Sequence, residues 1–115
     1  MAPADLVDLL RRHRYRATCE TELQQGISLV LSQAGIEHQR EVSLTPKDRP
    51  DFMVEGVAIE LKVDGSAPEV TRQLHRYAQH PDVVGIVLVT TRQRHMCMPA
   101  TMMGKPVRCL FVGRL

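Results

Sequence analysis

The sequence predicts an α/β fold in which helices flank a central mixed sheet. Residues 18–34 and 67–79 have the apolar spacing of amphipathic helices, and a short hairpin with strand-type alternation, 51–62, lies between them. Residues 83–90, VVGIVLVT, are a nearly continuous apolar run, which is typical of a strand buried on both faces. This order favours an α/β sandwich in which the second helix crosses over to the long strand.

The composition is that of one small domain, residues 1–115. Of these residues 43% are hydrophobic, which suffices for a single core of modest size. No apolar run approaches the roughly 20 residues of a membrane span, and the opening residues lack the pattern of a signal peptide. The three widely spaced cysteines suit reduced thiols. We therefore expect a cytoplasmic protein with no membrane partner.

A basic helical extension, residues 1–17, is expected to precede a core of about 18–91. Leu6, Leu9 and Leu10 have helical spacing, so we predict a helix over about 4–13. A basic run follows, with Arg11, Arg12, Arg14 and Arg16. Because the acidic residues concentrate in the middle of the chain, these arginines suit a protein that acts on a polyanion; alternatively, they only solubilise the surface.

Residues 18–34 are the stronger helix. The apolar stripe comprises Leu23, Ile27, Val30, Leu31 and Ala34. Gly35 suits the position that follows a helix C-terminus. Glu20 lies three residues before Leu23 and should share the buried stripe, whereas Glu22 should point nearer to solvent. Glu20 is therefore either a partner of the helix dipole or a reagent aimed inward.

The hairpin at residues 51–62 is the centre of the predicted fold. A strand over 37–44 and a loop over 45–50 lead into it. Glu55 and Gly56 are interpreted as a two-residue turn, because glycine supplies the positive φ that such a turn needs. This register pairs Phe52 with Ile59, Met53 with Ala58, and Val54 with Val57, and it brings Asp51 opposite Glu60.

Alternation gives the hairpin one apolar face and one charged face. The apolar face comprises Phe52, Val54, Val57, Ile59 and Leu61, and the charged face carries Asp51, Glu60 and Lys62. Like charges directly opposed across a sheet destabilise it. We therefore expect a cation to relieve the two carboxylates. It is either a divalent metal with oxygen ligands or Lys62 alone, as on an ordinary solvated strand.

The third helix, residues 67–79, should bury Val70, Leu74, Tyr77 and Ala78, and Ser66 and Glu69 have the spacing of a capping box. Gln73 should also face inward, where its amide needs partners. The opposite flank carries Arg72, His75 and Arg76.

A C-terminal extension, residues 92–115, contains a possible closing strand over 107–112. His95, Cys97 and Cys109 could form half of a zinc site, but no second closely spaced pair of ligands completes it.

These motifs resemble the PD-(D/E)XK nuclease superfamily. Pro50-Asp51, a short gap and then Glu60-Leu61-Lys62 match its signature, and the predicted element order matches its restriction-endonuclease-like α-β-β-β-α-β core. Gln73 and Tyr77 resemble the Gln-x-x-x-Tyr element of the exonuclease-like branch. Glu20 resembles the first-helix glutamate of that branch and of archaeal Holliday-junction resolvases. The chain is also similar to small phage-type proteins that carry this core alone, which implies a phage or bacterial source.

The resemblance implies a set of roles. Asp51, Glu60 and Glu20 would bind Mg²⁺ or Mn²⁺, with the Leu61 carbonyl as a further ligand. Lys62 would orient the attacking water or stabilise charge on the phosphate. Substrate contacts would come from Arg72 and Arg76 and from the basic run Arg11, Arg12, Arg14 and Arg16, while Gln73 and Tyr77 would brace the site or touch the substrate backbone.

The leading hypothesis is therefore a metal-dependent nuclease that hydrolyses DNA and reads shape or ends. One alternative is a catalytically silent nuclease-fold subunit that binds DNA or a partner protein, and another is a structural domain with a chance motif. We also expect a homodimer, because residues 96–103 include an apolar, methionine-rich stretch that suits a contact surface.

Overall fold

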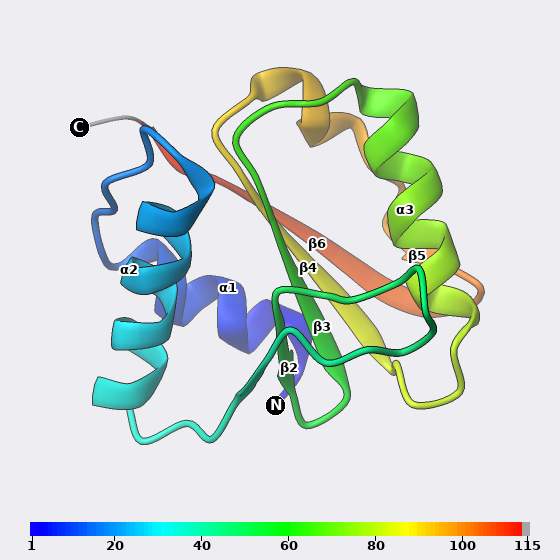
Figure 1. The fold of residues 1–115 in the computed structure, drawn as a ribbon, viewed down its shortest axis with the longest axis horizontal. Helices are drawn as coiled ribbons and strands as arrows, with labels where there is room; N and C mark the ends of the chain where they lie inside the picture. Colours follow the sequence, from blue (N-terminus) through cyan, green and yellow to red (C-terminus); the bar gives the residue numbers. More distant parts are fainter. Residues whose placement is uncertain (114–115) are drawn as a thin grey trace.

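A mixed sheet of six strands, in the order β1-β2-β3-β4-β6-β5, separates two layers of helices (Figure 1). The computed structural model describes residues 1–113. Helices α1 and α2 cover one face of the sheet and α3 covers the other. The helices are α1 (Pro3–Arg11), α2 (Glu20–Gln33), α3 (Ala67–Gln79) and the short 3₁₀ helix η1 (Gln93–Cys97). The strands are β1 (Gln39–Arg40), β2 (Phe52–Val54), β3 (Val57–Lys62), β4 (Gly85–Thr90), β5 (Thr101–Met102) and β6 (Lys105–Phe111).

The β2–β3 hairpin has the predicted register. β2 pairs antiparallel with β3, with Phe52 opposite Ile59, Met53 opposite Ala58 and Val54 opposite Val57. Glu55 and Gly56 have φ values of 48° and 82°, so both turn residues are left-handed, as a type I′ turn requires. The prediction of a two-residue turn is therefore confirmed.

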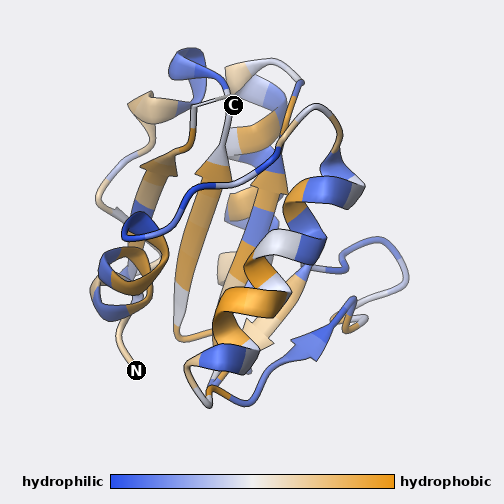
Figure 2. Cartoon of the chain, turned by 90° about the vertical axis from the view of Figure 1, so that its left-hand side faces the viewer, coloured by the Kyte–Doolittle hydropathy of each residue, from blue (hydrophilic) through white to orange (hydrophobic). Residues whose placement is uncertain are grey.

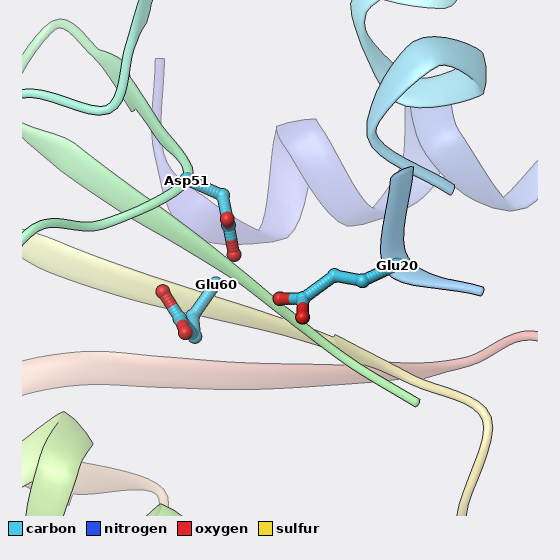
Figure 3. A group of neighbouring side chains, drawn as sticks. All are labelled: Glu20, Asp51 and Glu60. Atoms are coloured by element: carbon cyan, nitrogen blue, oxygen red, sulfur yellow. The ribbon is translucent and has the colours of Figure 1, made fainter. Parts of the chain in front are cut away.

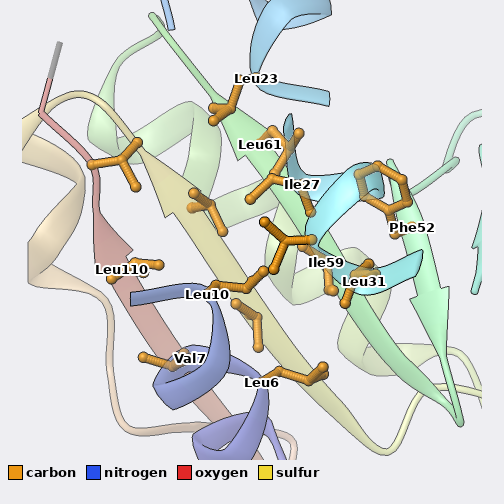
Figure 4. Close-up of a cluster of buried hydrophobic side chains, with 14 of the residues drawn as sticks. Leu6, Val7, Leu10, Leu23, Ile27, Leu31, Phe52, Ile59, Leu61 and Leu110 are labelled. Atoms are coloured by element: carbon orange, nitrogen blue, oxygen red, sulfur yellow. The ribbon is translucent and has the colours of Figure 1, made fainter. Parts of the chain in front are cut away.

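The two faces of the hairpin enter two different cores. The predicted apolar face of β2 and β3 packs against α1 and α2, where Leu23, Ile27 and Leu31 are fully buried (Figure 4). The alternate residues Met53 and Ala58 pack under α3 instead. The central strands are accordingly hydrophobic along most of their length (Figure 2). The prediction that Ala34 belongs to the buried stripe is wrong, because α2 ends at Gln33 and Ala34 is exposed.

The crossover from β3 to β4 also follows the prediction. The Ser66 hydroxyl accepts a hydrogen bond from the Glu69 N–H at 3.2 Å, which caps α3. The buried residues of α3 are Val70, Leu74, Tyr77 and Ala78, as expected. β4 runs parallel to β3 and all six of its residues are buried. The strand begins at Gly85, because Val84 is exposed and precedes the paired ladder.

The predicted strand over residues 37–44 is wrong in length, because only Gln39 and Arg40 pair with β2. Glu41 has a φ of 53°, which turns the chain away from the sheet edge. Val42 and Leu44 then pack against the core under α3. The segment 41–51 therefore folds over that face of the sheet instead of extending it.

The two predicted extensions contribute to the same core. Leu6 and Leu10 of α1 are fully buried, and α1 packs against β4 and β6. β6 pairs parallel with β4, so the predicted closing strand exists and begins two residues earlier than expected. The last two residues of the C-terminal segment, Arg114 among them, lie outside the described residues. Within residues 1–113, no helix is both long and apolar enough to span a membrane.

Gly35, which follows α2, and Gly56, in the hairpin turn, both have a positive φ, and a comparison of the two tests how the turn packs. A Cβ at Gly35 would meet no atom within 4 Å, so Gly35→Ala should cost only left-handed strain, about 1 to 2 kcal/mol. A Cβ at Gly56 would lie 3.0 Å from the Val84 Cγ2 atom and 3.3 Å from the Asp82 carbonyl oxygen. Gly56→Ala should therefore cost about 1 kcal/mol or more beyond that strain, as measured by urea unfolding. Adding Val84→Ala should recover part of the excess. Equal costs for the two single variants would contradict the packing of the turn against Val84.

Candidate functional site

Three carboxylates converge at one end of the β2–β3 hairpin (Figure 3). They belong to Glu20, the first residue of α2, to Asp51, directly before β2, and to Glu60 in β3. One oxygen from each lies within 4.8 Å of the others, and no other His, Cys, Asp and Glu residues of the described chain form such a group. Asp51 is 8% exposed and Glu60 is 4% exposed. The hairpin and the start of α2 thus hold negative charge in a poorly solvated place.

Asp51 is fixed by two hydrogen bonds, one to each carboxylate oxygen. The Leu61 N–H donates to Oδ2 at 2.8 Å, and the Gln24 side-chain amide donates to Oδ1 at 2.7 Å. The paired ladder begins at Phe52, so Asp51 lies one residue outside it and its side chain takes up a strand N–H. Asp51 therefore has a structural role, because its removal would leave the buried Leu61 N–H without this acceptor.

Glu60 is held between a tyrosine and a lysine. Its Oε1 accepts a hydrogen bond from the Tyr77 hydroxyl at 3.0 Å, and its Oε2 lies 3.0 Å from the Lys62 ammonium. The pKa of the Glu60 carboxyl is raised from 4.5 to about 7, mainly by burial and next by the nearby charge of Asp51, while Lys62 and Tyr77 oppose the shift. The lysine thus relieves the charge of the pair only in part.

Glu20 and Glu22 differ as helical spacing predicts. Burial raises the pKa of the Glu20 carboxyl, and Asp51 adds to that effect, while Lys62 lowers the pKa. Glu22 instead accepts hydrogen bonds from the backbone and hydroxyl of Thr18, and the bond from the hydroxyl is the main cause of its lowered pKa. Glu20 therefore faces the carboxylate pair, and Glu22 caps the chain ahead of α2.

Gln73, Tyr77 and Glu60 are connected by a chain of two hydrogen bonds. The Gln73 amide donates to the Tyr77 hydroxyl oxygen at 2.9 Å, which supplies the partner that an inward-facing amide needs. Burial and the charge of Glu60 raise the pKa of the Tyr77 hydroxyl, so it remains protonated and donates to Glu60. Tyr77 is fully buried. Of the two roles expected for Tyr77, this burial favours bracing the site over contact with a substrate, because the side chain lies behind the Glu60 carboxylate.

The predicted substrate arginines occupy two separate places. Lys62, Arg72, Gln73 and Arg76 line an open cavity of about 350 Å³ beside α3, together with the turn at residues 64–65. Arg76 is partly committed, because its Nε donates to the buried Asp48 carboxylate at 2.8 Å. The basic run Arg11, Arg12, Arg14 and Arg16 is exposed and lines no part of this cavity.

Size alone does not identify the site. A larger hollow, about 900 Å³, lies near the hairpin turn and is lined by Ile36, His38, Val42 and Met53 among others. Neither this hollow nor the cavity beside α3 is lined by any of the three clustered carboxylates. The smaller cavity beside α3 includes Lys62, the ion-pair partner of Glu60. The chemistry therefore favours the smaller cavity.

The incomplete zinc site is not assembled. His95 is fully buried, and both of its ring nitrogens are engaged, Nδ1 with the Thr90 hydroxyl at 2.6 Å and Nε2 with the Gly65 carbonyl oxygen at 2.7 Å. Neither Cys97 nor Cys109 belongs to a candidate metal group among residues 1–113. His95 instead fastens the turn that follows β3.

Sequence reasoning missed two residues that support the site. Gln24 has a weak signal, because it lies four residues after Glu20 and so shares that face of α2. Asp48 has none, because it lies in an irregular loop and its partner Arg76 is 28 residues away.

Comparison of the chain with protein-family models, with curated proteins and with solved structures found no match.

The raised pKa of Glu60 predicts how the metal-free protein responds to pH. Because the folded state holds the proton more tightly, the contribution of Glu60 to stability is full below pH 4.5 and is lost as the pH rises towards 7. The loss amounts to about 3 kcal/mol at most. Urea unfolding at pH 5 and pH 8 in the presence of a chelator should show this slope, and Glu60→Gln should reduce it by the part that Glu60 contributes.

The matched control for this experiment is Glu22→Gln, whose wild-type carboxyl has a lowered pKa and lies at the surface. An unchanged slope in Glu60→Gln would mean that Glu60 is ionised in the folded protein throughout this range.

Proposed function

We propose that the chain is a divalent-metal-dependent nuclease with a restriction-endonuclease-like core of the PD-(D/E)XK type, and that it hydrolyses phosphodiester bonds of DNA. One observation carries the proposal: two nearly buried carboxylates, Asp51 and Glu60, lie together at the end of a hairpin, with a third from Glu20 and the Lys62 amine beside them. The raised pKa values of Glu60 and Glu20 mark a place where negative charge lacks sufficient compensation.

The donor set fits Mg²⁺ or Mn²⁺. All three side chains offer carboxylate oxygens, which are the ligands that these hard cations prefer. Each oxygen of Asp51 accepts one hydrogen bond, so lone pairs remain on both. Asp51, Glu60 and Glu20 would hold the metal, and by the resemblance the Leu61 carbonyl would be a further ligand. Such a metal supplies a water that is nucleophilic near neutral pH and a positive charge at the phosphoryl oxygens.

Lys62 connects the carboxylates to the cavity beside α3. Its ammonium lies 3.0 Å from Glu60 and its side chain is 22% exposed. Because the same side chain lines the cavity, it can contact a phosphate there while staying next to the carboxylates. In the proposed reaction Lys62 orients the attacking water or stabilises the charge that develops on the phosphate.

The substrate would bind by its backbone. Arg72 and Arg76 bring positive charge to the lining of the cavity, next to the carboxylates of Asp64 and Glu69, and Gln73 adds an amide. The exposed run Arg11, Arg12, Arg14 and Arg16 would add contacts to more distant phosphates. These contacts reach phosphates and not base edges, so we propose recognition of shape or ends, and pairing of two chains into a homodimer.

A specific observation favours a second candidate, a silent nuclease-fold subunit that binds DNA or a partner protein. Among the described residues, no buried side-chain nitrogen or oxygen lacks a hydrogen-bond partner. The carboxylates of Asp51 and Glu60 therefore have partners without a metal. In this alternative Lys62 acts only as the counter-ion of Glu60.

Lys62 separates the two candidates. In the nuclease, Lys62→Ala should lower the rate of cleavage of linear, nicked, branched or single-stranded DNA by about 100-fold or more. Binding of Mn²⁺ should persist, because the carboxylates remain. Lys62→Arg should restore little activity, since a planar guanidinium does not replace a compact ammonium.

The control for this test is Lys47→Ala, which changes an exposed lysine in the loop ahead of the hairpin. Wild-type cleavage rates in Lys62→Ala would exclude the proposed role of the lysine. Absence of cleavage by the wild-type protein on all four substrates, with Mg²⁺ or Mn²⁺ present, would favour the silent subunit.

A further inference from the structure

The two central carboxylates are each oriented by two donors. Glu60 receives the Tyr77 hydroxyl and the Lys62 ammonium, and Asp51 receives the Leu61 N–H and the Gln24 amide. Of these donors only Gln24 comes from α2, the helix that also carries Glu20. The other three donors, Tyr77, Lys62 and Leu61, were predicted from the sequence to belong to the site, and Gln24 was not.

We propose that Gln24 is a positioning residue for the metal site, which sets the orientation of the Asp51 carboxylate and joins it to the helix of Glu20. The inference rests on the proposed function, since it concerns the same metal. Gln24 does not touch the metal in this account; it acts through Asp51.

Local geometry supports this role. The terminal torsion of an aspartate is broad, so a carboxylate held by one hydrogen bond can still rotate about its last bond. Here the donors reach different oxygens from different elements, Leu61 from β3 to Oδ2 and Gln24 from α2 to Oδ1. Two such contacts at 2.8 and 2.7 Å fix the plane of the carboxylate. The lone pairs not used by these donors then keep one orientation relative to Glu60.

Gln24 also fixes the helix. It follows Glu20 by four residues, so both side chains leave the same face of α2. Leu23 is fully buried beside it and holds this turn of α2 on the sheet. The amide bond to Asp51 therefore ties the first turns of α2 to the start of β2. This tie keeps the Glu20 carboxylate within reach of the other two.

If the hydrogen bond from Gln24 to Asp51 were purely structural, its loss would affect folding and not metal binding. Its loss would cost about 1 kcal/mol of folding free energy and would leave the metal affinity of the folded protein unchanged. Loss of a residue that orients a metal ligand typically weakens metal affinity by about 10- to 100-fold. Metal affinity measured on folded protein therefore separates the two roles.

The test compares Gln24→Met with Gln25→Met. Methionine keeps the length of the glutamine side chain but donates no hydrogen bond, and the exposed Gln25 is the matched neighbour on the same helix. Mn²⁺ binding is measured by calorimetry on folded protein, and cleavage is measured as a function of Mn²⁺ concentration. For Gln24→Met we expect Mn²⁺ binding about 10- to 100-fold weaker. The Mn²⁺ concentration for half-maximal cleavage should rise by the same factor, with a near-normal rate at saturating Mn²⁺. Gln25→Met should match the wild type.

A second variant protects the test against a folding failure. Gln24→Asn keeps an amide but withdraws it from Asp51 by one methylene, so it should weaken Mn²⁺ binding in the same direction. Wild-type Mn²⁺ affinity in a folded Gln24 variant would overturn the inference and leave the proposed function intact. A wild-type protein that binds no Mn²⁺ would overturn both.

Discussion

The repulsion between Asp51 and Glu60 is the constraint on which the rest of the site depends. The type I′ turn and the register of β2 against β3 bring the two carboxylates together at the end of the hairpin, with both side chains over nine-tenths buried. In such a place ionisation is costly, and the pKa of Glu60 rises to about 7 as a result. The surrounding structure supplies donors to these carboxylates and leaves negative charge that a divalent cation would neutralise.

Much of the surrounding structure holds the two strands in place. The buried Asp48 anchors the loop before Asp51 to α3 through Arg76. After Lys62, His95 and Arg94 both bond to the Gly65 carbonyl oxygen, which fastens the turn that follows β3. These contacts tie the segments on both sides of the hairpin to the helical layers. Rigid support of this kind is what a site needs in order to keep charged groups at fixed distances.

The sequence predicted those parts of the fold in which local pattern and tertiary contact agree. The register of the hairpin follows from a period of two and one glycine, and the buried face of α3 follows from a clear helical period. The prediction of a strand over residues 37–44 was wrong because Glu41 adopts a left-handed conformation, which its residue type does not indicate. The position of β6 next to β4 was not predictable either. A strand that is buried on both faces gives no sequence signal for which strand pairs with each of its edges.

The site was predictable to a similar extent. Glu20 was distinguished from Glu22 by helical geometry alone, and the structure places Glu20 with the carboxylate pair. Gln24 and Asp48 were missed because their partners, Asp51 and Arg76, are 27 and 28 residues away. Such contacts depend on how elements pack, and a single sequence carries no periodic signal for them. Tyr77 was placed correctly on its helix face, but its burial behind Glu60 became visible only in three dimensions.

The most direct test of the central claim is the anomalous scattering of Mn²⁺ in crystals of the wild-type protein. If the three carboxylates hold a divalent metal, an anomalous peak lies between Asp51 and Glu60, with Glu20 bound directly or through water and Glu22 away from it. A peak elsewhere, or none at saturating Mn²⁺ with the three carboxylates ordered and accessible, would show that they do not form a metal site.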